Sequence, residues 1–158
     1  MGRDKTFYHT NEKMVKDLLA ITPIIETDVV LDAGSGKNKV WYHHIDVVEK
    51  HECEIEDGCD FYTWDKPVDW IIGNPPFHES WKFFDKASQI SQKGIAFLVN
   101  NLALNSWTPK RFALMDNRGF ELTFIQVVND KRWFGRYYYM IFRKGYRGFI
   151  GWTCETYT

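Results

Sequence analysis

The chain has 158 residues, a length that fits one domain with a sizeable core. It has no apolar segment behind its first basic residues and no apolar run long enough to cross a bilayer, so we expect no secretory signal, no membrane span and a cytoplasmic location. The five histidines form no metal-ligand pattern, so we expect no metal site. Cys53, Cys59 and Cys154 are odd in number and lack CxxC spacing, which predicts free thiols in a reducing compartment.

Charge is unevenly distributed although the formal net charge is only −1. Residues 46–69 carry nine acids and two bases, whereas residues 101–158 carry nine bases and four acids. A basic second half is suited to a polyanionic partner. On charge alone, a solvated surface of mixed sign is the favoured interpretation.

The first predicted elements are a helix and a short strand. Thr10 or Asn11 can cap a helix whose apolar residues fall on one face, and Pro23 ends it. The β-branched run at residues 29–31 predicts a strand that leads directly into Asp32.

A glycine-containing loop, residues 32–38, follows this strand. Gly34 and Gly36 allow a sharp turn and close approach of the backbone to a ligand, with Asp32 facing that ligand. A phosphate-binding P-loop matches poorly, because Leu31 stands where its first glycine belongs and Asn38 where Ser or Thr belongs. A dinucleotide-binding fingerprint lacks its third glycine.

Residues 40–48 are apolar and aromatic around two histidines, which predicts a second strand with Asp46 at or near its end. An acid at the end of the second strand of such a unit commonly bonds ribose hydroxyls. The alternative, that Asp46 is a surface acid in an acidic region, stays open. A third segment brings Cys59, Asp60 and Phe61.

The next strand, residues 68–72, delivers Asn74-Pro75-Pro76-Phe77. Two prolines fix two φ angles and remove two N–H donors, and Asn74 is pushed to an extended conformation because it precedes a proline. The result is a rigid hook at the carboxyl end of a strand. The Asn74 side-chain oxygen and the Pro75 carbonyl can accept the two N–H groups of an exocyclic amine, and Phe77 can stack on its ring. Alone, this stretch fits a proline-rich turn almost as well.

The remaining segments alternate between helices and strands. A helix over residues 78–93, with Gly94 ending it, precedes a strand at residues 95–99. A helix begins after Thr108 with Pro109 in its first turn, and strands follow at residues 120–128 and 137–142. The alternation predicts an α/β fold with a mostly parallel sheet and helices on both faces.

The glycine loop at residues 32–36, followed by Asn74-Pro75-Pro76-Phe77, resembles the S-adenosylmethionine-dependent N6-adenine methyltransferases, in particular small phage and prophage members. The family implies a Rossmann-like class I methyltransferase fold over residues 1–158. Many DNA-modifying members carry a separate target-recognition domain, and because the roughly eighty residues after Phe77 leave no room for one, we expect a single domain. It also implies S-adenosylmethionine as cofactor. The implied cofactor-binding residues, including a methionine-contacting motif at residues 7–10, are Thr10, Asp32, Ala33, Gly34, Gly36, Asp46, Asp60, Phe61 and Asn74. The implied catalytic residues are Asn74, Pro75, Pro76 and Phe77.

The resemblance implies methyl transfer to adenine N6 in nucleic acid, with DNA preferred over RNA as the expected polymer. The motif reads NPPF rather than DPPY, a form also found in RNA and protein methyltransferases. The alternatives are an RNA adenine methyltransferase, a protein-glutamine methyltransferase, and a catalytically silent methyltransferase fold that serves as a binding subunit. The four bases that we consider for phosphate contacts are Arg111, Lys131, Arg132 and Arg136.

Overall fold

The computed structural model describes residues 10–148 and 150–157, with the backbone but not the side chains of residues 152–154. The α-helices are α1 (Glu12–Ile21), α2 (Val40–His44), α3 (Ser80–Ile90), α4 (Asn101–Asn105) and α5 (Pro109–Asn117). Single turns of 3-10 helix are η1 (Ile55–Asp57), η2 (Phe61–Thr63) and η3 (Phe77–Glu79). The strands are β1 (Val29–Ala33), β2 (Glu49–Cys53), β3 (Val68–Gly73), β4 (Ser91–Asn100), β5 (Phe120–Asp130), β6 (Tyr137–Lys144) and β7 (Gly151–Tyr157).

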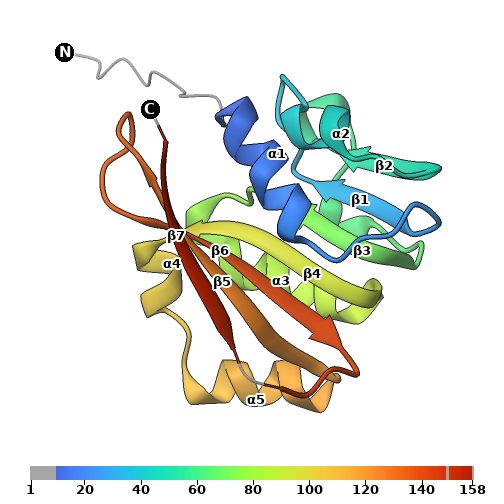
Figure 1. Cartoon of the computed structure of the whole chain (residues 1–158). Coiled ribbons are helices and arrows are strands. Elements are labelled where there is room, and N and C mark those ends of the chain that lie inside the picture. The colour runs from blue at the N-terminus through green and yellow to red at the C-terminus, as the bar shows by residue number, and fades with distance from the viewer. Residues whose placement is uncertain (1–9, 149, 158) are drawn as a thin grey trace.

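The strands form one sheet in the order β2-β1-β3-β4-β6-β5-β7 (Figure 1). Paired strands are parallel except where β6 runs against β4 and β5. The carboxyl ends of the parallel strands therefore lie along one edge of the sheet, which we call the carboxyl edge. The strand β6 begins at this edge, since Tyr137 pairs with Asn100 at the end of β4. The expected mostly parallel α/β architecture is confirmed.

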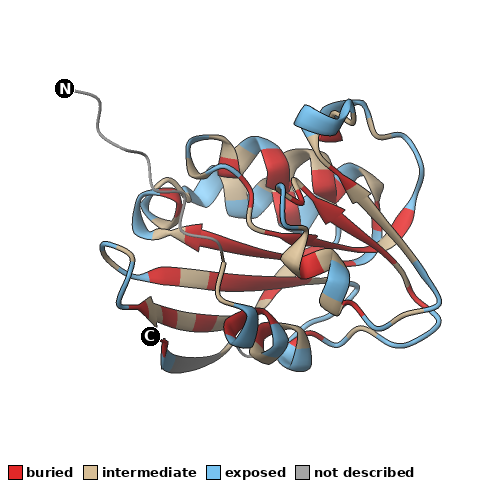
Figure 2. Cartoon of the chain, turned by 90° about the horizontal axis from the view of Figure 1, so that it is seen from above, coloured by how far each residue is buried: buried red, intermediate tan, exposed pale blue. Residues whose placement is uncertain are grey.

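The sheet separates two apolar cores. On one face, α3 and α5 bury Phe84 and Met115 against the strands. On the other face, α1 and α2 bury Leu18 and Trp41. Helices thus cover both faces, and the central strands are buried along most of their length (Figures 1 and 2). This burial explains why the central strands read as continuous apolar runs in the sequence.

The helix starts follow the capping signals of the sequence. Asn11 caps α1 through its side-chain oxygen, which accepts the Met14 N–H at 3.1 Å. Thr108 caps α5, and Pro109 occupies its first turn, as expected. Both caps fix where the helix leaves the preceding loop.

The predicted helix over residues 78–93 is too long at both ends. A 3-10 turn, η3, precedes α3, and Ser91 already belongs to β4. Gly94 lies inside β4 beside Trp70 of β3, and a Cβ on it would lie 2.2 Å from the Trp70 ring. The glycine therefore makes room for an indole and does not end a helix.

Residues 40–48 are not the predicted second strand. Residues 40–44 form α2, and the second strand, β2, begins only at Glu49. The helical turn is favoured because it buries Trp41, which stacks on Tyr139 with ring centroids 5.7 Å apart. Asp46 therefore precedes β2 and lies away from the carboxyl edge. Neither α4 nor the edge strand β7 was predicted from the sequence.

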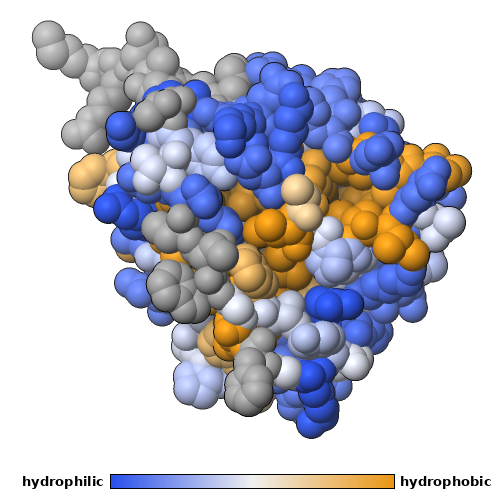
Figure 3. All heavy atoms as spheres, in the orientation of Figure 1, coloured by the Kyte–Doolittle hydropathy of each residue, from blue (hydrophilic) through white to orange (hydrophobic). Residues whose placement is uncertain are grey.

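Exposed apolar side chains gather at the opposite edge of the sheet. Ile21, Ile25 and Val48 are 39%, 56% and 80% exposed, at the end of α1 and just before β1 and β2. Figure 3 shows the apolar surface that lies over these segments. In the described part of the chain, no helix has the length and apolar character needed to cross a bilayer.

Candidate functional site

The candidate site lies where β1 and β3 end side by side on the carboxyl edge. The chain passes from β1 outward to β2 and then returns to β3 on the other side of β1, so the strand order reverses at this point. Ligands of open α/β sheets bind in the crevice at such a reversal. Gly73 lets the two strand ends approach closely, because a Cβ on it would lie 2.9 Å from the Ala33 carbonyl oxygen.

The glycine loop is anchored over the end of β2. The N–H groups of Gly34 and Ser35 donate to the Cys53 carbonyl at 2.8 and 3.1 Å. Both Gly34 and Gly36 have positive φ angles, 72° and 70°, which L side chains rarely adopt. The Gly36 N–H donates to a Glu54 carboxylate oxygen at 2.6 Å. The sequence expectation of a sharply turned glycine loop is met by this geometry.

Lys39 closes the loop and ties it to acids on and after β2. Its ammonium group lies 2.6 Å from Glu52 and 3.1 Å from Asp57. The hydrogen bond to Glu52 raises the pKa of Lys39 to about 12. The same Glu52 accepts the Ser35 hydroxyl at 2.7 Å. The loop is therefore held on its outer side by a network of charged groups.

Asp32 lies at the end of β1 with its carboxyl group buried. One oxygen, Oδ2, accepts the Tyr42 N–H at 3.0 Å, and Oδ1 has no hydrogen-bond partner among the described residues. Burial raises the pKa of Asp32 to about 8. A buried carboxyl oxygen without a partner costs free energy, so this group is suited to a polar or cationic ligand.

Asn74 lies at the end of β3, and its Oδ1 atom is likewise buried and has no partner among the described residues. Both proline peptide bonds that follow are trans, and Pro75 is buried while Pro76 is exposed. From the described residues, no hydrogen-bond donor reaches the Pro75 carbonyl. The predicted hook thus presents two acceptors that receive no donor from the part of the chain that the structure describes.

Phe77 opens the 3-10 turn η3 beside this hook. Its ring contacts Tyr137 with centroids 5.4 Å apart, and Tyr137 in turn contacts Trp133 at 4.5 Å. The Phe77 carbonyl accepts the Ser80 hydroxyl at 2.6 Å, which connects the hook to α3. Phe77 remains half-buried, so part of its ring faces the carboxyl edge.

A cavity of about 400 Å³ joins the hook to the glycine loop. Its lining includes four residues that the sequence analysis assigned to the cofactor, namely Thr10, Gly34, Gly36 and Asn74. Residues 7–9 of the expected methionine-contacting motif lie outside the described residues. The volume is within the usual range for sites of small molecules and cofactors.

Asp46 does not join these residues. It is exposed and lines a separate hollow between α1 and α2, together with Lys16 and His44. Two acids that follow β2 line the 400 Å³ cavity, Glu54 directly after the strand and Glu56 two residues later. The rule that links an acid at the end of the second strand to ribose would have selected Glu54, had residues 40–48 been read as helix.

Asp60 and Phe61 lie at the start of η2. One Asp60 carboxylate oxygen caps this turn by accepting the Tyr62 N–H at 2.9 Å. Phe61 is only 4% exposed and stacks on Phe83 with centroids 4.9 Å apart. Neither residue lines the 400 Å³ cavity, and Phe61 supports the position of Asp60 from the core.

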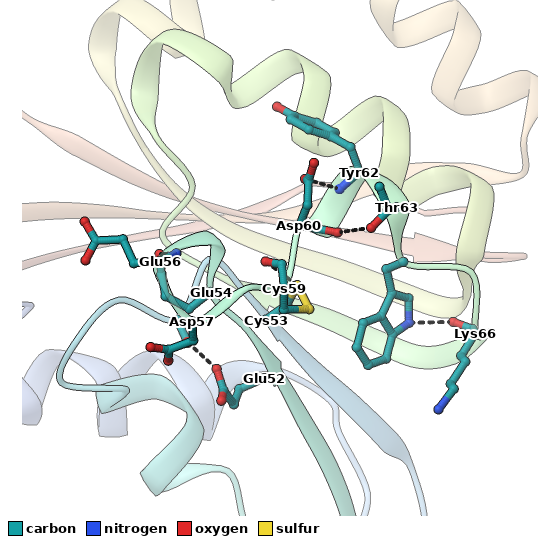
Figure 4. Close-up of a disulfide and its surroundings, with 12 residues drawn as sticks. Glu52, Cys53, Glu54, Glu56, Asp57, Cys59, Asp60, Tyr62, Thr63 and Lys66 are labelled. Atoms are coloured by element: carbon teal, nitrogen blue, oxygen red, sulfur yellow. Dashed lines mark hydrogen bonds between the residues drawn. A yellow bond between two sulfur atoms is a disulfide. The ribbon is translucent and has the colours of Figure 1, made fainter.

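The expectation of free thiols is wrong for two of the cysteines. Cys53, the last residue of β2, and Cys59 form a disulfide, with their Cα atoms 5.1 Å apart (Figure 4). The η1 turn and Gly58, with a φ of 88°, bring Cys59 back to the strand end. A spacing of five residues between cysteines is not a recognised motif, so the sequence offered no signal for this bridge. The bridge closes the segment that contains Glu54.

No group of His, Cys, Asp and Glu side chains within the described ranges could hold a metal ion. The geometry offers a small-molecule cavity bounded by the glycine loop, by Glu54 and Glu56, and by Asn74 of the hook. Such a set can bind a polar, partly cationic molecule and can hold an amine beside it.

No protein-family model matches the sequence, and no curated protein matches it in a sequence search. Solved structures do match. The 23S rRNA methyltransferase ErmE superposes with a TM-score of 0.70 at 15% identity, over 89% of this chain and 72% of ErmE. PH1948 from Pyrococcus horikoshii, described as a candidate RNA methyltransferase, gives 0.66 at 18% identity over 87% of both chains. Magnesium protoporphyrin IX methyltransferase from Synechocystis PCC 6803, crystallised with bound S-adenosylmethionine, gives 0.64 at 10% identity, over 84% of this chain and 79% of that one. The chain therefore has the Rossmann-like fold of class I methyltransferases.

Proposed function

We propose that the protein transfers a methyl group from S-adenosylmethionine to the N6 amino group of adenine in nucleic acid. The observation that carries the proposal is the Asn74 side-chain oxygen, buried without a partner beside the 400 Å³ cavity. An acceptor in this state is ready to bind a donor without breaking an existing bond.

The residues around the cavity fit the cofactor. The glycine loop would approach it with backbone groups. Asp32 is not among the residues that line the cavity, and its buried Oδ1, which has no partner among the described residues, remains our proposal for a polar contact with the cofactor. Glu54, rather than Asp46, is our proposal for the ribose hydroxyls, because it lines the cavity directly after β2. Asp60 remains our proposal for the adenine amino group of the cofactor. When bound, S-adenosylmethionine supplies a methyl group activated by the adjacent sulfonium.

The hook positions the amine that is to be methylated. The lone pair of adenine N6 is delocalised into the ring, which makes the nitrogen a weak nucleophile. Asn74 Oδ1 and the Pro75 carbonyl would accept its two N–H groups and favour a pyramidal, more nucleophilic nitrogen. Phe77 would hold the base by stacking. This mechanism depends on positioning and on pre-organised acceptors.

The proposal also concerns which nucleic acid, DNA or RNA, carries the target adenine. The sequence resemblance supports DNA. RNA is the second candidate, because structures with the same fold include ErmE, named as a 23S rRNA methyltransferase, and a dimethyladenosine transferase from Plasmodium falciparum. In either polymer a paired adenine must leave its stack to reach the hook.

A hairpin between β5 and β6 supports a nucleic-acid partner. It carries Lys131, Arg132 and Arg136, and its tip residue Phe134 is fully exposed. Trp133 in the same hairpin contacts Tyr137, which contacts Phe77. An exposed aromatic ring among cations next to the hook is suited to contacts with bases and phosphates.

One assay tests the proposal. Purified protein is incubated with S-adenosylmethionine carrying a labelled methyl group and with DNA, total RNA or a protein extract, followed by nucleoside and amino-acid analysis. We expect N6-methyladenosine or its deoxy form. Label in glutamine would contradict this proposal and indicate a protein methyltransferase. Absence of label from DNA, RNA and protein would indicate a methyltransferase fold without catalytic activity.

A further inference from the structure

Two adjoining hollows lie next to the hook and share no lining residue with the cofactor cavity. The first, of about 460 Å³, lies between η3, α4 and the start of α3, and Phe77 is part of its wall. The second, of about 590 Å³, continues along α5. Trp81 and Arg111 line both hollows, which therefore adjoin at this pair of side chains. We call the two hollows together the groove, and Phe77 lines its end at the hook.

The groove is cationic. None of the described residues that line its two hollows is an Asp or a Glu, whereas the cofactor cavity includes Glu54 and Glu56. Arg111 is half-buried in the groove, and Lys110 and His78 are exposed on its wall. Among the described residues, no carboxylate forms an ion pair with Arg111 or Lys110. A half-buried guanidinium group without a carboxylate is suited to an anionic ligand.

Arg111 is also held in place. One terminal nitrogen, Nη1, donates to the Ser106 carbonyl at 2.7 Å. The guanidinium plane lies over the Trp81 ring, 4.9 Å from its centroid. Trp81 is itself fixed by Trp107, with ring centroids 5.4 Å apart. The remaining N–H groups of Arg111 are thus presented from a rigid support, which lowers the entropic cost of binding.

The groove combines this cation with aromatic rings. Phe77 and Trp81 stand on its wall, and exposed Leu102 extends the apolar surface on the α4 side. A cationic groove with aromatic side chains is the arrangement by which proteins bind single-stranded nucleic acid, because unpaired bases stack on the rings while phosphates meet the cations. Bases in an intact duplex are stacked on each other and present no free face to such rings.

We propose that this groove binds the unpaired nucleotides next to the target adenine, with Arg111 and Lys110 contacting their phosphates. The proposal rests on the function proposed above, since the groove begins at Phe77, which belongs to the hook. It identifies the substrate as a single strand or a loop, at least over the nucleotides beside the target.

The test measures binding of fluorescent 12-nucleotide single strands of DNA and RNA by anisotropy over a salt series. The variants are Arg111→Gln and Lys110→Gln, with Lys66→Gln as the matched control. Lys66 is exposed and lies in the acidic half, before β3. Thermal melting and S-adenosylmethionine binding confirm that each variant is folded. Lys110 is fully on the surface, so its variant keeps the test valid if Arg111→Gln fails to fold.

We expect each groove variant to weaken binding about fivefold or more and to make the slope of log affinity against log salt less steep by about 0.7, the value for one phosphate contact on a single strand. Lys66→Gln should match the wild type. In methyl transfer, the groove variants should raise KM and leave kcat near the wild-type value. The proposal is contradicted if the folded variants bind the single strands as tightly as the wild type does, or if the wild type binds neither DNA nor RNA single strands. Weakened binding without any methyl transfer by the wild type would instead refute the proposed function and leave the groove standing.

Discussion

Asn74 is the residue on which the proposed chemistry most directly depends. Its Oδ1 atom is buried and without a partner, so removing it breaks no bond that the described residues make. We expect Asn74→Ala to lower the rate of methyl transfer by about 100- to 1,000-fold, as loss of one pre-organised polar group does. S-adenosylmethionine affinity should change little, because the lost group faces the amine. Single-turnover kinetics and calorimetry measure the two quantities.

A conservative change at the same position provides the control. Asn74→Asp keeps an oxygen acceptor at the end of β3 and should retain far more activity than Asn74→Ala. If both variants are as active as the wild type, Asn74-Pro75-Pro76-Phe77 is only a turn.

Asp32 gives a prediction on stability and pH. Burial raises its pKa in the folded protein to about 8, whereas the ordinary value is near 3.8. Between these two values the unfolded chain has released the proton and the folded protein still holds it. The contribution of Asp32 to the free energy of unfolding therefore falls as pH rises from about 4 to about 8, by at most about 1.4 kcal/mol per pH unit.

The variant Asp32→Asn lacks the ionisable carboxyl group, so its stability has no contribution from the titration of residue 32. Urea unfolding at pH 5 and at pH 7.5 should show the wild type losing stability relative to Asp32→Asn as pH rises. Other groups titrate in both proteins and cancel in the difference. A difference that stays constant between the two pH values would mean that Asp32 is ionised in the folded protein.

At the scale of elements, the disulfide supports the segment that follows β2. It closes a loop over residues 53–59 that contains Glu54, which accepts the Gly36 N–H. Opening this bridge should lower the free energy of unfolding by about 2 kcal/mol, the loop-closure value for a loop of this size. It should also weaken S-adenosylmethionine binding, because the glycine loop loses a fixed partner.

Thermal melting and calorimetry with and without dithiothreitol measure both effects. Cys59→Ser is the control, since the reductant should have no effect on a variant that lacks the bridge. If dithiothreitol changes Cys59→Ser as much as the wild type, the bridge does not support the site.

The hairpin between β5 and β6 gives the next prediction at this scale. The Phe134 side chain packs against nothing in the described structure and is fully exposed, so Phe134→Ser should leave the melting temperature unchanged. If Phe134 takes the place of a base that has left its stack, the variant should methylate adenine in a duplex more slowly and adenine in a single strand at the wild-type rate. Val48→Ser, at the opposite edge of the sheet, is a matched exposed control. Equal losses on both substrates would exclude such a role.

The elements also show which parts of the fold the sequence could predict. The strands β1, β3 and β6 were recognisable because their apolar runs or alternation reflect burial within the sheet. Residues 40–48 were misread because a short apolar run fits a buried helix as well as a strand, and burial of Trp41 against Tyr139 decides between them. That contact joins residues almost one hundred positions apart, so no local pattern contains it.

The same limit applies to the site. Asp32, Gly34, Gly36 and Asn74 were found because acids, glycines and prolines at strand ends carry strong local signals. Glu54 was missed because its assignment depends on where β2 ends. Arg111 was considered only as one of several bases, since its contact with Trp81 is a property of packing between α5 and α3.

At the scale of the whole molecule, the acidic and the basic regions lie toward opposite edges of the sheet. The acidic residues 46–69 surround β2 and the turns that follow it, at one side of the sheet. The basic residues of the second half belong to α5, β6 and the connections that precede and follow β5 and β6, toward the other side. The hook at the end of β3 lies between these regions, so a polyanion is favoured on the side of the hook that faces the groove and the hairpin.

This arrangement predicts how affinity depends on salt. If phosphates meet the bases of the second half, binding releases counterions, and log affinity should fall linearly with log salt by about 0.7 per contacted phosphate for a single strand. With the groove and the hairpin both engaged, we expect a slope of about −2 to −4 for single-stranded DNA or RNA. S-adenosylmethionine binding, measured over the same series, serves as the internal control because it involves no phosphate and should be much less sensitive to salt. An affinity for nucleic acid that does not change between low and high salt would contradict phosphate contacts and would favour a protein substrate for the same hook.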